Sequence, residues 1–442
     1  MMNYTQAVQF HEDTKKYGSI LGLDSIRALM HELGDVWRKL KIVHIAGTNG
    51  KGSVCCFLAS VFKEAGYITG QFNSPAVFDL REIYQVNGAW IGREEYAFCM
   101  EQVKAACERM LQKGRSHPTV FEIETALAFL WFSQRKCDIV ILETGMGGKT
   151  DATNLIEQPL CSVFTSICLD HMDFLGDSIA KITEVKAGII KRNCPVVTTK
   201  QLPEAEEILR QKAEASDAAY YTAPEISESR AADGRLIFSY PGLGEIKLSM
   251  TGSYQIENAA LAVKTLQVLA KRGYSVTKRQ ILKGMEKAKW SGRFECLSID
   301  PLFYIDGAHN TAAAEELKIS LTSRFPNSKR IGIMGVMADK PYREMLKVLH
   351  SVFEEIYTVT PDNKRALPAE KLAEECRRQN ITAMEKESVR DAVKDACERA
   401  KAVGEDAVVT AFGSLYYLKE VKYALYKIKG NAKAYLHAIR QF

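Results

Sequence analysis

HIAGTNGKGS, at residues 44–53, is the stretch that decides the fold. It follows the apolar run 42–45 and precedes an apolar segment from Val54 to Ala65. This order predicts a strand, a glycine-rich loop and a helix. In such a loop the backbone N–H groups and the helix N-terminus attract phosphate, and Lys51 can neutralise its terminal oxygens.

The spelling of this loop departs from the strict P-loop pattern. Two residues separate Gly47 from Gly50, and Gly52 stands between Lys51 and Ser53. A chance glycine-rich turn is the alternative interpretation. The order of strand, loop and helix favours the phosphate loop, because that order supplies the helix N-terminus that an anion needs.

Two further apolar runs, 138–142 and 160–165, also end where polar or glycine residues begin. Helix-length amphipathic segments separate such runs, which is typical of a mostly parallel sheet. The carboxyl ends of parallel strands form a ligand crevice. We therefore expect these two junctions to lie beside the phosphate loop.

A nucleotide bound there would need Mg²⁺, which prefers oxygen ligands. Glu143 directly follows the second run, and Asp170 and His171 follow the third, with Asp173 close by. These side chains are candidate metal ligands. Two structural interpretations stay open: a helix-capping role for Glu143 and a hydrogen-bonded structural role for His171.

Lys186 stands in the otherwise apolar helical segment 184–189. Most lysines in such segments extend their charged end to solvent. The residues alone favour that interpretation over a role in the site.

The second half of the chain repeats the alternating pattern. Its apolar runs are 302–305, 330–334, 356–359 and 407–410. The polar, turn-prone segment 289–293 is a candidate hinge between two domains. We expect an α/β protein with a P-loop-type, mostly parallel sheet domain over residues 1–295 and a smaller Rossmann-like α/β domain over residues 296–442. Segment 201–248 is less regular, and we expect strands and a helix packed on the first sheet.

Charge and composition exclude several classes of function. The net charge is +5, from 59 basic and 54 acidic residues, which gives no general nucleic-acid signal. The dense basic run near the C-terminus is expected to be a solvated helix face; it comprises Lys422, Lys427, Lys429, Lys433 and Arg440.

The eleven cysteines contain no C-x-x-C pair and several lie in apolar runs, so we expect small buried hydrophobic residues. The N-terminal residues are polar, and no stretch is long and apolar enough to span a bilayer. We therefore expect a cytoplasmic protein without a membrane or nucleic-acid partner.

Taken together, the motifs resemble the folylpolyglutamate synthase/dihydrofolate synthase family, a branch of the Mur-type ligases. The resemblance rests on eight ordered motifs: HIAGTNGKGS (44–53), LETGMGGKTDATN (142–154), LDH (169–171), KAGI (186–189), NAALA (258–262), SGRFE (291–295), DGAHN (306–310) and GSLY (413–416).

The resemblance implies a role for each residue of the site. Those implied to hold the nucleotide are Gly47, Thr48, Asn49, Gly50, Lys51, Gly52, Ser53, Asn258, Arg293 and Asp306. The implied magnesium ligands are Ser74, Glu143 and His171, and a carbamylated Lys186 would help to hold a second ion. Lys51, Lys186 and His309 would act in catalysis. The implied pterin contacts are Phe121, Glu122, Thr150, Asp151 and Ala152.

The implied reaction is ATP-dependent ligation of L-glutamate to a folate, and to dihydropteroate, through an acyl phosphate. The resemblance also favours a monomer. Two segments depart from the family pattern. In the first, Ala76 follows Ser74-Pro75 where the family often has a histidine, and the arginine of Arg81-Glu82-Ile83 is shifted by one place from the family's ERI-like stretch. In the second, Tyr254 stands where the family has another histidine. The contacts that the 74–83 loop makes with folate are therefore open.

Two other functions share part of this pattern. A cell-wall Mur ligase shares the phosphate loop, but it carries an additional domain ahead of that loop, and only about 40 residues precede Ile42 here. A regulatory P-loop protein would not need a second α/β domain that contributes Asp306 and His309 to the site.

Overall fold

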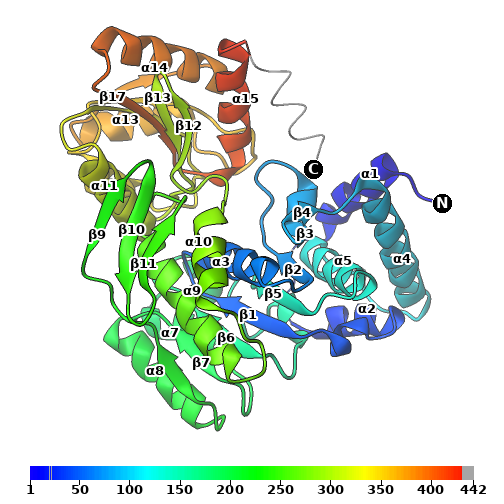
Figure 1. Cartoon of the computed structure of the whole chain (residues 1–442). Helices are drawn as coiled ribbons and strands as arrows, with labels where there is room; N and C mark the ends of the chain where they lie inside the picture. Colours follow the sequence, from blue (N-terminus) through cyan, green and yellow to red (C-terminus); the bar gives the residue numbers. More distant parts are fainter. Residues whose placement is uncertain (19, 21, 431–442) are drawn as a thin grey trace.

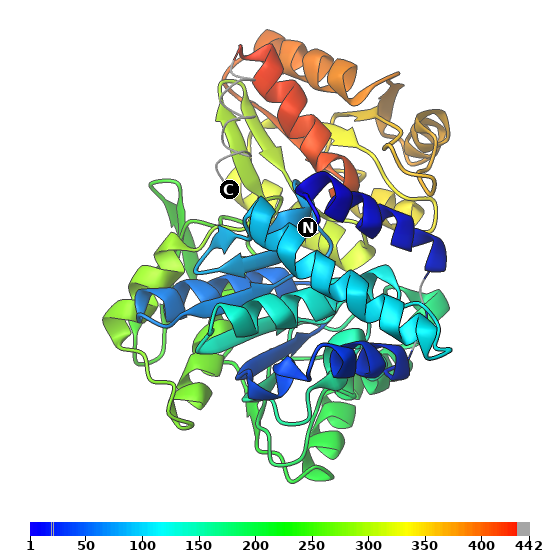
Figure 2. The ribbon, with the colours of Figure 1, turned by 90° about the vertical axis from the view of Figure 1, so that its right-hand side faces the viewer.

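The computed structural model describes residues 1–18, 20 and 22–430. These residues form two lobes, a larger one built on an eight-stranded sheet and a smaller one built on a six-stranded sheet (Figure 1). The smaller lobe, coloured mainly yellow to red, lies above the larger one in both views (Figures 1 and 2). The predicted α/β architecture with two mostly parallel sheets is confirmed.

The large sheet places the three predicted strand ends side by side. Its order is β4-β3-β2-β5-β1-β6-β7-β8, and the neighbouring pairs from β2 to β8 are parallel. Because β1 lies between β5 and β6, their carboxyl ends open on one crevice. The bounds are β1 Ile42–Ala46, β2 Thr69–Phe72, β3 Tyr84–Val86, β4 Ala89–Trp90, β5 Ile139–Glu143, β6 Cys161–Phe164, β7 Val196–Thr198 and β8 Tyr220–Thr222.

Helices cover both faces of this sheet, which explains the continuous apolar run 139–142 in the central strand β5. In β5, Ile139 and Ile141 point into one core, and Val140 and Leu142 point into the other. The first core is closed by α3 Lys51–Glu64, α9 Gln255–Ala270 and α10 Lys278–Lys287. The second is closed by α1 Tyr4–Thr14, α2 Asp24–Glu32, α4 Arg93–Gln112 and α5 Val120–Gln134.

Part of the less regular segment 201–248 packs on the large sheet, as expected, and the sheet formed by its last three strands packs against α9 and α10. Its helix α8 Pro203–Glu214 follows α6 Met172–Leu175 and α7 Ile179–Ala187 along the chain, and β8 joins the sheet edge. A separate antiparallel sheet follows, made of β9 Ser229–Ala232, β10 Arg235–Tyr240 and β11 Gly244–Leu248. Leu236, Phe238 and Ile246 of this sheet complete the core on the α9 side.

The smaller lobe has the strand order β12-β13-β17-β14-β15-β16, in which only the β12–β13 pair among these strands is antiparallel. Its strands are β12 Glu295–Ile299, β13 Leu302–Ile305, β14 Lys329–Met334, β15 Glu355–Thr358, β16 Thr382–Glu385 and β17 Ala407–Phe412. Its helices are α11 Thr311–Arg324, α12 Tyr342–Leu349, α13 Ala369–Arg378, α14 Val389–Val403 and α15 Leu418–Ile428. The expected hinge 289–293 links α10 to β12.

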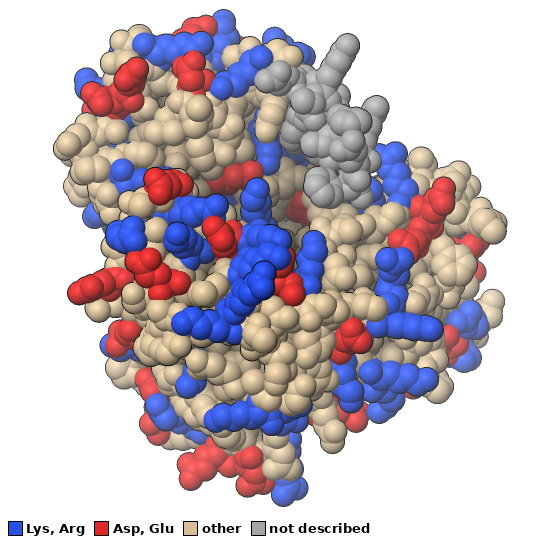
Figure 3. Space-filling model, in the orientation of Figure 1, with Lys and Arg blue, Asp and Glu red and all other residues tan. Residues whose placement is uncertain are grey.

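Charges of both signs are interspersed over the face shown in Figure 3. In the basic run, Lys427 and Lys429 are exposed. Lys422 is not solvated as expected, because it is partly buried and its Nζ lies 2.8 Å from Glu295 Oε1. Lys433 and Arg440 lie outside the described residues. No helix within the described ranges is long and apolar enough to cross a membrane.

The eleven cysteines, all within the described part of the chain, are free thiols. Most are buried, as expected, but Cys137 and Cys168 are partly exposed and Cys296 is exposed.

Candidate functional site

The phosphate loop connects β1 to α3. Gly50 caps α3 with a φ of 89°, and a Cβ on this residue would lie 2.3 Å from Asn258 Oδ1. Only glycine fits this turn. Lys51 Nζ donates hydrogen bonds of 3.2 Å to the carbonyl oxygens of Gly47 and Thr48. The ammonium group thus lies over the loop, where the oxygens of a phosphate would be neutralised.

One cavity of about 290 Å³ collects side chains from both lobes. Its walls come from the phosphate loop, the loops after β2, β5 and β6, helices α7 and α9, and the segment after β13. Every residue that the family resemblance assigned to nucleotide, metal or catalysis lines it: Gly47, Thr48, Asn49, Gly50, Lys51, Gly52, Ser53, Ser74, Glu143, His171, Lys186, Asn258, Arg293, Asp306 and His309. Asp170 lines it too, whereas Asp173, the further candidate ligand after β6, does not.

Glu143, the last residue of β5, faces the lysine of the phosphate loop. Its Oε2 accepts a 2.6 Å hydrogen bond from Asn73 Nδ2, and its Oε1 lies 3.9 Å from Lys51 Nζ. Burial raises the pKa of Glu143, although the charge of Lys51 and the Asn73 hydrogen bond oppose the rise. The helix-capping interpretation fails, because the chain continues as a loop up to Ala152.

His171 precedes α6 in the loop after β6, with a left-handed φ of 51°. Although the residue is exposed, desolvation of its ring by the surrounding protein lowers its pKa to about 4; Asp170 opposes the shift, and the cations Lys340 and Lys51 add to it. The imidazole is therefore neutral at pH 7, which is the form that binds a metal.

The donor set fits a magnesium ion that is bound together with phosphate. Ser74 and Glu143 offer oxygens and His171 a neutral nitrogen, all on the cavity that holds the phosphate loop. Within the described ranges, no three His, Cys, Asp or Glu side chains form a closed metal cage. Mg²⁺ keeps several waters and uses substrate phosphates, so an incomplete protein shell is what such a site requires.

Lys186 corrects the interpretation drawn from the residues alone. Its side chain does not reach solvent; the residue is 4% exposed, and its Nζ donates a 2.8 Å hydrogen bond to the Gly47 carbonyl oxygen. Burial, and then the charge of Lys51, lower the pKa of Lys186 to about 7. An amine in this range is partly uncharged at neutral pH and can act as a nucleophile.

The Asp306 carboxylate accepts hydrogen bonds that stabilise the chain beside the hinge 289–293. Its Oδ2 accepts hydrogen bonds of 2.7 Å from the Tyr254 hydroxyl and 2.8 Å from the Phe294 N–H, and its Oδ1 accepts one of 2.8 Å from the Ala308 N–H. Burial raises the pKa of Asp306. The phenol of Tyr254 therefore has a structural partner, and Arg293 lies beside this group on the cavity wall.

Sequence reasoning missed a buried polar group that joins the lobes. Asp170 contacts Lys340, Asn310 and His309 of the smaller lobe. Burial alone would raise the pKa of Asp170, but the hydrogen bond and charge of His309, and then the charge of Lys340, hold it well below its usual range. The sequence signal was weak: Lys340 stands in a loop after an apolar run, as many surface lysines do.

A second cavity, of about 790 Å³, adjoins the first. It is lined by the predicted pterin contacts Phe121, Glu122, Thr150, Asp151 and Ala152. The two cavities share wall residues, among them Ser74, Gly145, Met146 and His171. A molecule in the second cavity can therefore place one end beside the phosphate loop.

Two of these predicted contacts also have structural roles. The Glu122 carboxylate accepts hydrogen bonds from the N–H and the hydroxyl of Thr119, at 2.7 and 2.9 Å. The Asp151 carboxylate accepts hydrogen bonds from the N–H groups of Met146 and Thr153, at 2.8 and 2.9 Å. These bonds shape the wall, so Phe121 is the large predicted side chain left to contact a ring.

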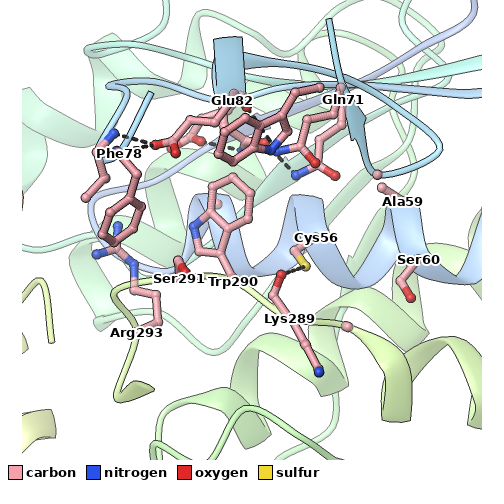
Figure 4. A pocket seen from close by; sticks show the side chains of 18 of the residues that line it. Cys56, Ala59, Ser60, Gln71, Phe78, Glu82, Lys289, Trp290, Ser291 and Arg293 are labelled. Atoms are coloured by element: carbon pink, nitrogen blue, oxygen red, sulfur yellow. Dashed lines mark hydrogen bonds between the residues drawn. The ribbon is translucent and has the colours of Figure 1, made fainter. Parts of the chain in front are cut away.

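A third cavity, of about 590 Å³, was not anticipated. Figure 4 shows the Trp290 indole at its centre, with Gln71 and Glu82 above it and Phe78 to one side. A Cβ on Gly52 would lie 2.8 Å from Trp290 Nε1, so the indole packs on the start of α3. The sequence marked this tryptophan only as part of a hinge.

The departure from the family pattern near Ala76 also has a structural outcome. Arg81 is buried, and its Nε donates a 3.0 Å hydrogen bond to Asp79 Oδ1. The Glu82 carboxylate accepts the backbone N–H groups of Val77 and Phe78. The side chains of Arg81 and Glu82 thus make hydrogen bonds within this loop and stabilise its conformation.

Comparisons with known proteins agree with this architecture. The Mur ligase middle domain matches residues 45–266, and the Mur ligase glutamate ligase domain matches residues 292–415. The chain is 36% identical over 428 residues to the dihydrofolate synthase/folylpolyglutamate synthase of Bacillus subtilis, covering 95% of this chain and 98% of that protein.

Solved structures show the same likeness. The Mycobacterium tuberculosis folylpolyglutamate synthase complexed with ADP and AMPPCP has a TM-score of 0.87 and 28% identity, covering 96% of this chain and 99% of that chain. E. coli FolC in complex with DHPP and ADP has a TM-score of 0.83 and 28% identity, covering 96% and 98%. The chain therefore belongs to the folylpolyglutamate synthase/dihydrofolate synthase family of Mur-type ligases.

Proposed function

We propose that this protein joins L-glutamate to dihydropteroate and to reduced folates, using ATP to activate the acceptor's terminal carboxylate as an acyl phosphate. One observation carries the proposal: the phosphate loop, the strand-end ligands and the smaller lobe meet in one cavity, and this cavity shares a wall with a second one large enough for a pteroyl group. A regulatory nucleotide switch would not need that second cavity.

The nucleotide would lie with its phosphates on residues 47–53. Lys51 would neutralise the charge that develops on the transferred phosphoryl group. Ser74, Glu143 and His171 would hold Mg²⁺, which supplies further neutralisation of phosphate oxygens when bound. Asn258 and Arg293 line the same cavity and would contact the remainder of the nucleotide.

Lys186 would carry a carbamate. Its buried Nζ, with a pKa lowered to about 7, would attack CO₂ as the free amine and lose one proton. The product is a carboxylate on a lysine stem, which can accept hydrogen bonds or help to hold a second cation. Such a change of charge beside Lys51 would relieve the repulsion between the two ammonium groups.

The acceptor would enter through the second cavity, with Phe121, Thr150 and Ala152 along its ring system and its carboxylate near Ser74. A carboxylate oxygen attacks the γ-phosphorus of ATP and ADP leaves. The glutamate amine then attacks the activated carbonyl carbon, loses a proton, and phosphate leaves. His309, at the edge of the smaller lobe, would orient the phosphates, and closure of the lobe would exclude water.

A side-by-side acceptor assay tests this function. ATP and L-glutamate are supplied with dihydropteroate, with tetrahydrofolate or with no acceptor, and products are identified by mass while phosphate is measured. We expect acceptor- and glutamate-dependent phosphate release and products that are heavier by one glutamate. Phosphate release that depends on neither the acceptor nor glutamate would favour a regulatory nucleotide switch. A product formed only with cell-wall precursors would favour a Mur peptide ligase.

A further inference from the structure

The carboxylate of Asp170 joins the two lobes on the phosphate-loop side of the cavity. Its Oδ1 accepts a 2.7 Å hydrogen bond from Lys340 Nζ, and its Oδ2 accepts one of 3.0 Å from Asn310 Nδ2. His309 Nε2 lies 3.5 Å from the same Oδ2. One carboxylate of the larger lobe therefore contacts two separate segments of the smaller lobe, the loop after β13 and the loop after β14.

These contacts are shielded from water. Asp170 is 8% exposed and Asn310 is fully buried, and the Lys340 side chain is 11% exposed. A buried ion pair is weak evidence for added stability, but removing one partner leaves an uncompensated charge. The group is therefore suited to defining a relative position of the lobes that is lost when either partner is changed.

The same group reaches the phosphate loop. Asn310 and Asn49 exchange amide hydrogen bonds, with Asn49 Nδ2 donating at 3.2 Å and Asn310 Nδ2 donating at 3.1 Å. Asn310 also caps α11, since its Oδ1 accepts from the Ala313 N–H at 2.9 Å. The loop around Asn49 is thus hydrogen-bonded directly to the cap of α11, and Asp170 contacts the same cap.

We propose that Asp170 is a positioning residue that latches the smaller lobe over the phosphate loop through Lys340 and Asn310. The latch keeps His309 at the nucleotide cavity and keeps water out while the activated acceptor waits for glutamate. The inference rests on the proposed ligase function, because exclusion of water matters only when a water-sensitive intermediate forms. The proposal adds Lys340 and Asn310, which contact Asp170, to the residues on which closure of the smaller lobe depends.

The chemical test uses Asp170→Asn, which removes the charge and nearly preserves the shape. We expect the rate of glutamate addition to fall about 100-fold, as for misplacement of a reacting group by about 1 Å. The number of phosphates released per amide bond should rise well above one, because water reaches the acyl phosphate. Lys340→Met should behave alike, and Lys340→Arg should restore the coupling. Asp177→Asn, which breaks the exposed Asp177–Lys181 pair of 2.9 Å, is the matched control.

The structural test needs no turnover. Hydrogen exchange is followed in the full chain with a non-hydrolysable ATP analogue. Peptides covering 47–53 and 306–313 should exchange faster in Asp170→Asn and in Lys340→Met than in the wild type, and β17 should not change. If Asp170→Asn does not fold, the comparison of Lys340→Met with Lys340→Arg tests the latch instead.

The latch would be overturned if the variants released one phosphate per amide bond and exchanged hydrogen at 47–53 and 306–313 as the wild type does, whatever their turnover rates. A wild-type protein that forms no glutamate adduct would refute the proposed function instead, and the exchange comparison would still decide the latch.

Discussion

Lys186 Nζ donates a 2.8 Å hydrogen bond to the carbonyl oxygen of Gly47, which joins a buried helix lysine directly to the phosphate loop. The charge state of Lys186 is thereby linked to the geometry of the loop at Gly47. Because Lys51 Nζ contacts the same carbonyl oxygen at 3.2 Å, two amines share one acceptor. Any modification of Lys186 must therefore change how the loop is held.

This linkage predicts a pH effect on stability. The unfolded chain keeps a proton on Lys186 up to its ordinary pKa of 10.5, whereas the folded protein releases it near pH 7. The unfolded state then binds more protons, so raising the pH favours folding, by up to about 1.4 kcal/mol per pH unit.

The measurement is the free energy of unfolding between pH 7 and 9, in buffer free of bicarbonate. The rise in this window should be smaller in Lys186→Met than in the wild type. Lys181→Met, an exposed lysine of the same helix, is the control and should follow the wild type. Equal curves for Lys186→Met and the wild type would contradict the lowered pKa.

Lys51→Ala should lower kcat by about 100- to 1000-fold, the usual effect of removing one preorganised electrostatic contact to a transition state. The variant should fold, because Lys51 begins α3 at the cavity and alanine is a good helix former. Steady-state kinetics with saturating ATP, compared with the exposed α8 variant Lys212→Ala, provide the check. Near-normal turnover by folded Lys51→Ala would remove this residue from the mechanism.

Gly50→Ala and Gly66→Ala form a matched pair, because their φ angles are 89° and 88°. Both variants pay about 1–2 kcal/mol of backbone strain. Only the Cβ at Gly50 meets a neighbour, Asn258 Oδ1 at 2.3 Å, whereas nothing lies within 4 Å at Gly66. Calorimetric titration with ADP should show weaker binding for Gly50→Ala alone. Equal ADP affinity in both variants would argue that the turn at Gly50 does not shape the nucleotide site.

Tyr254→Phe should lower stability by about 1–3 kcal/mol, because the buried Asp306 carboxylate loses its 2.7 Å hydrogen bond. Tyr254→His restores a donor of the kind that the family pattern has here, so it should recover part of the loss. Denaturant unfolding of both variants measures the effect. If histidine proves no better than phenylalanine, the phenol does not stand in for the family's histidine.

Phe121→Ala should raise the KM for dihydropteroate about tenfold or more, through loss of an aromatic contact to the pterin ring, and should leave the KM for ATP unchanged. The two constants are measured in the same coupled assay. An unchanged KM for dihydropteroate would place the pterin elsewhere, and the cavity around Trp290 would become the next position to test.

Local pattern was enough to predict most of the fold. The strands at 42–46, 139–143 and 302–305 agree with the apolar runs, because a strand buried on both faces is mostly apolar. The phosphate loop and the neighbouring strand ends were predictable for a similar reason. Parallel topology brings carboxyl ends together, so Gly47–Ser53, Glu143 and His171 had to open on one crevice.

The remaining features needed the packed structure. An amphipathic pattern cannot distinguish a lysine that reaches solvent from one that turns inward, and Lys186 turned inward because the Gly47 carbonyl oxygen was there to accept its hydrogen bond. The Asp170–Lys340 pair joins residues 170 positions apart in the chain, so no local spacing could reveal it. The sequence by itself determined the elements and the phosphate loop; the tertiary structure decided which charges are buried, because burial depends on contacts between distant segments.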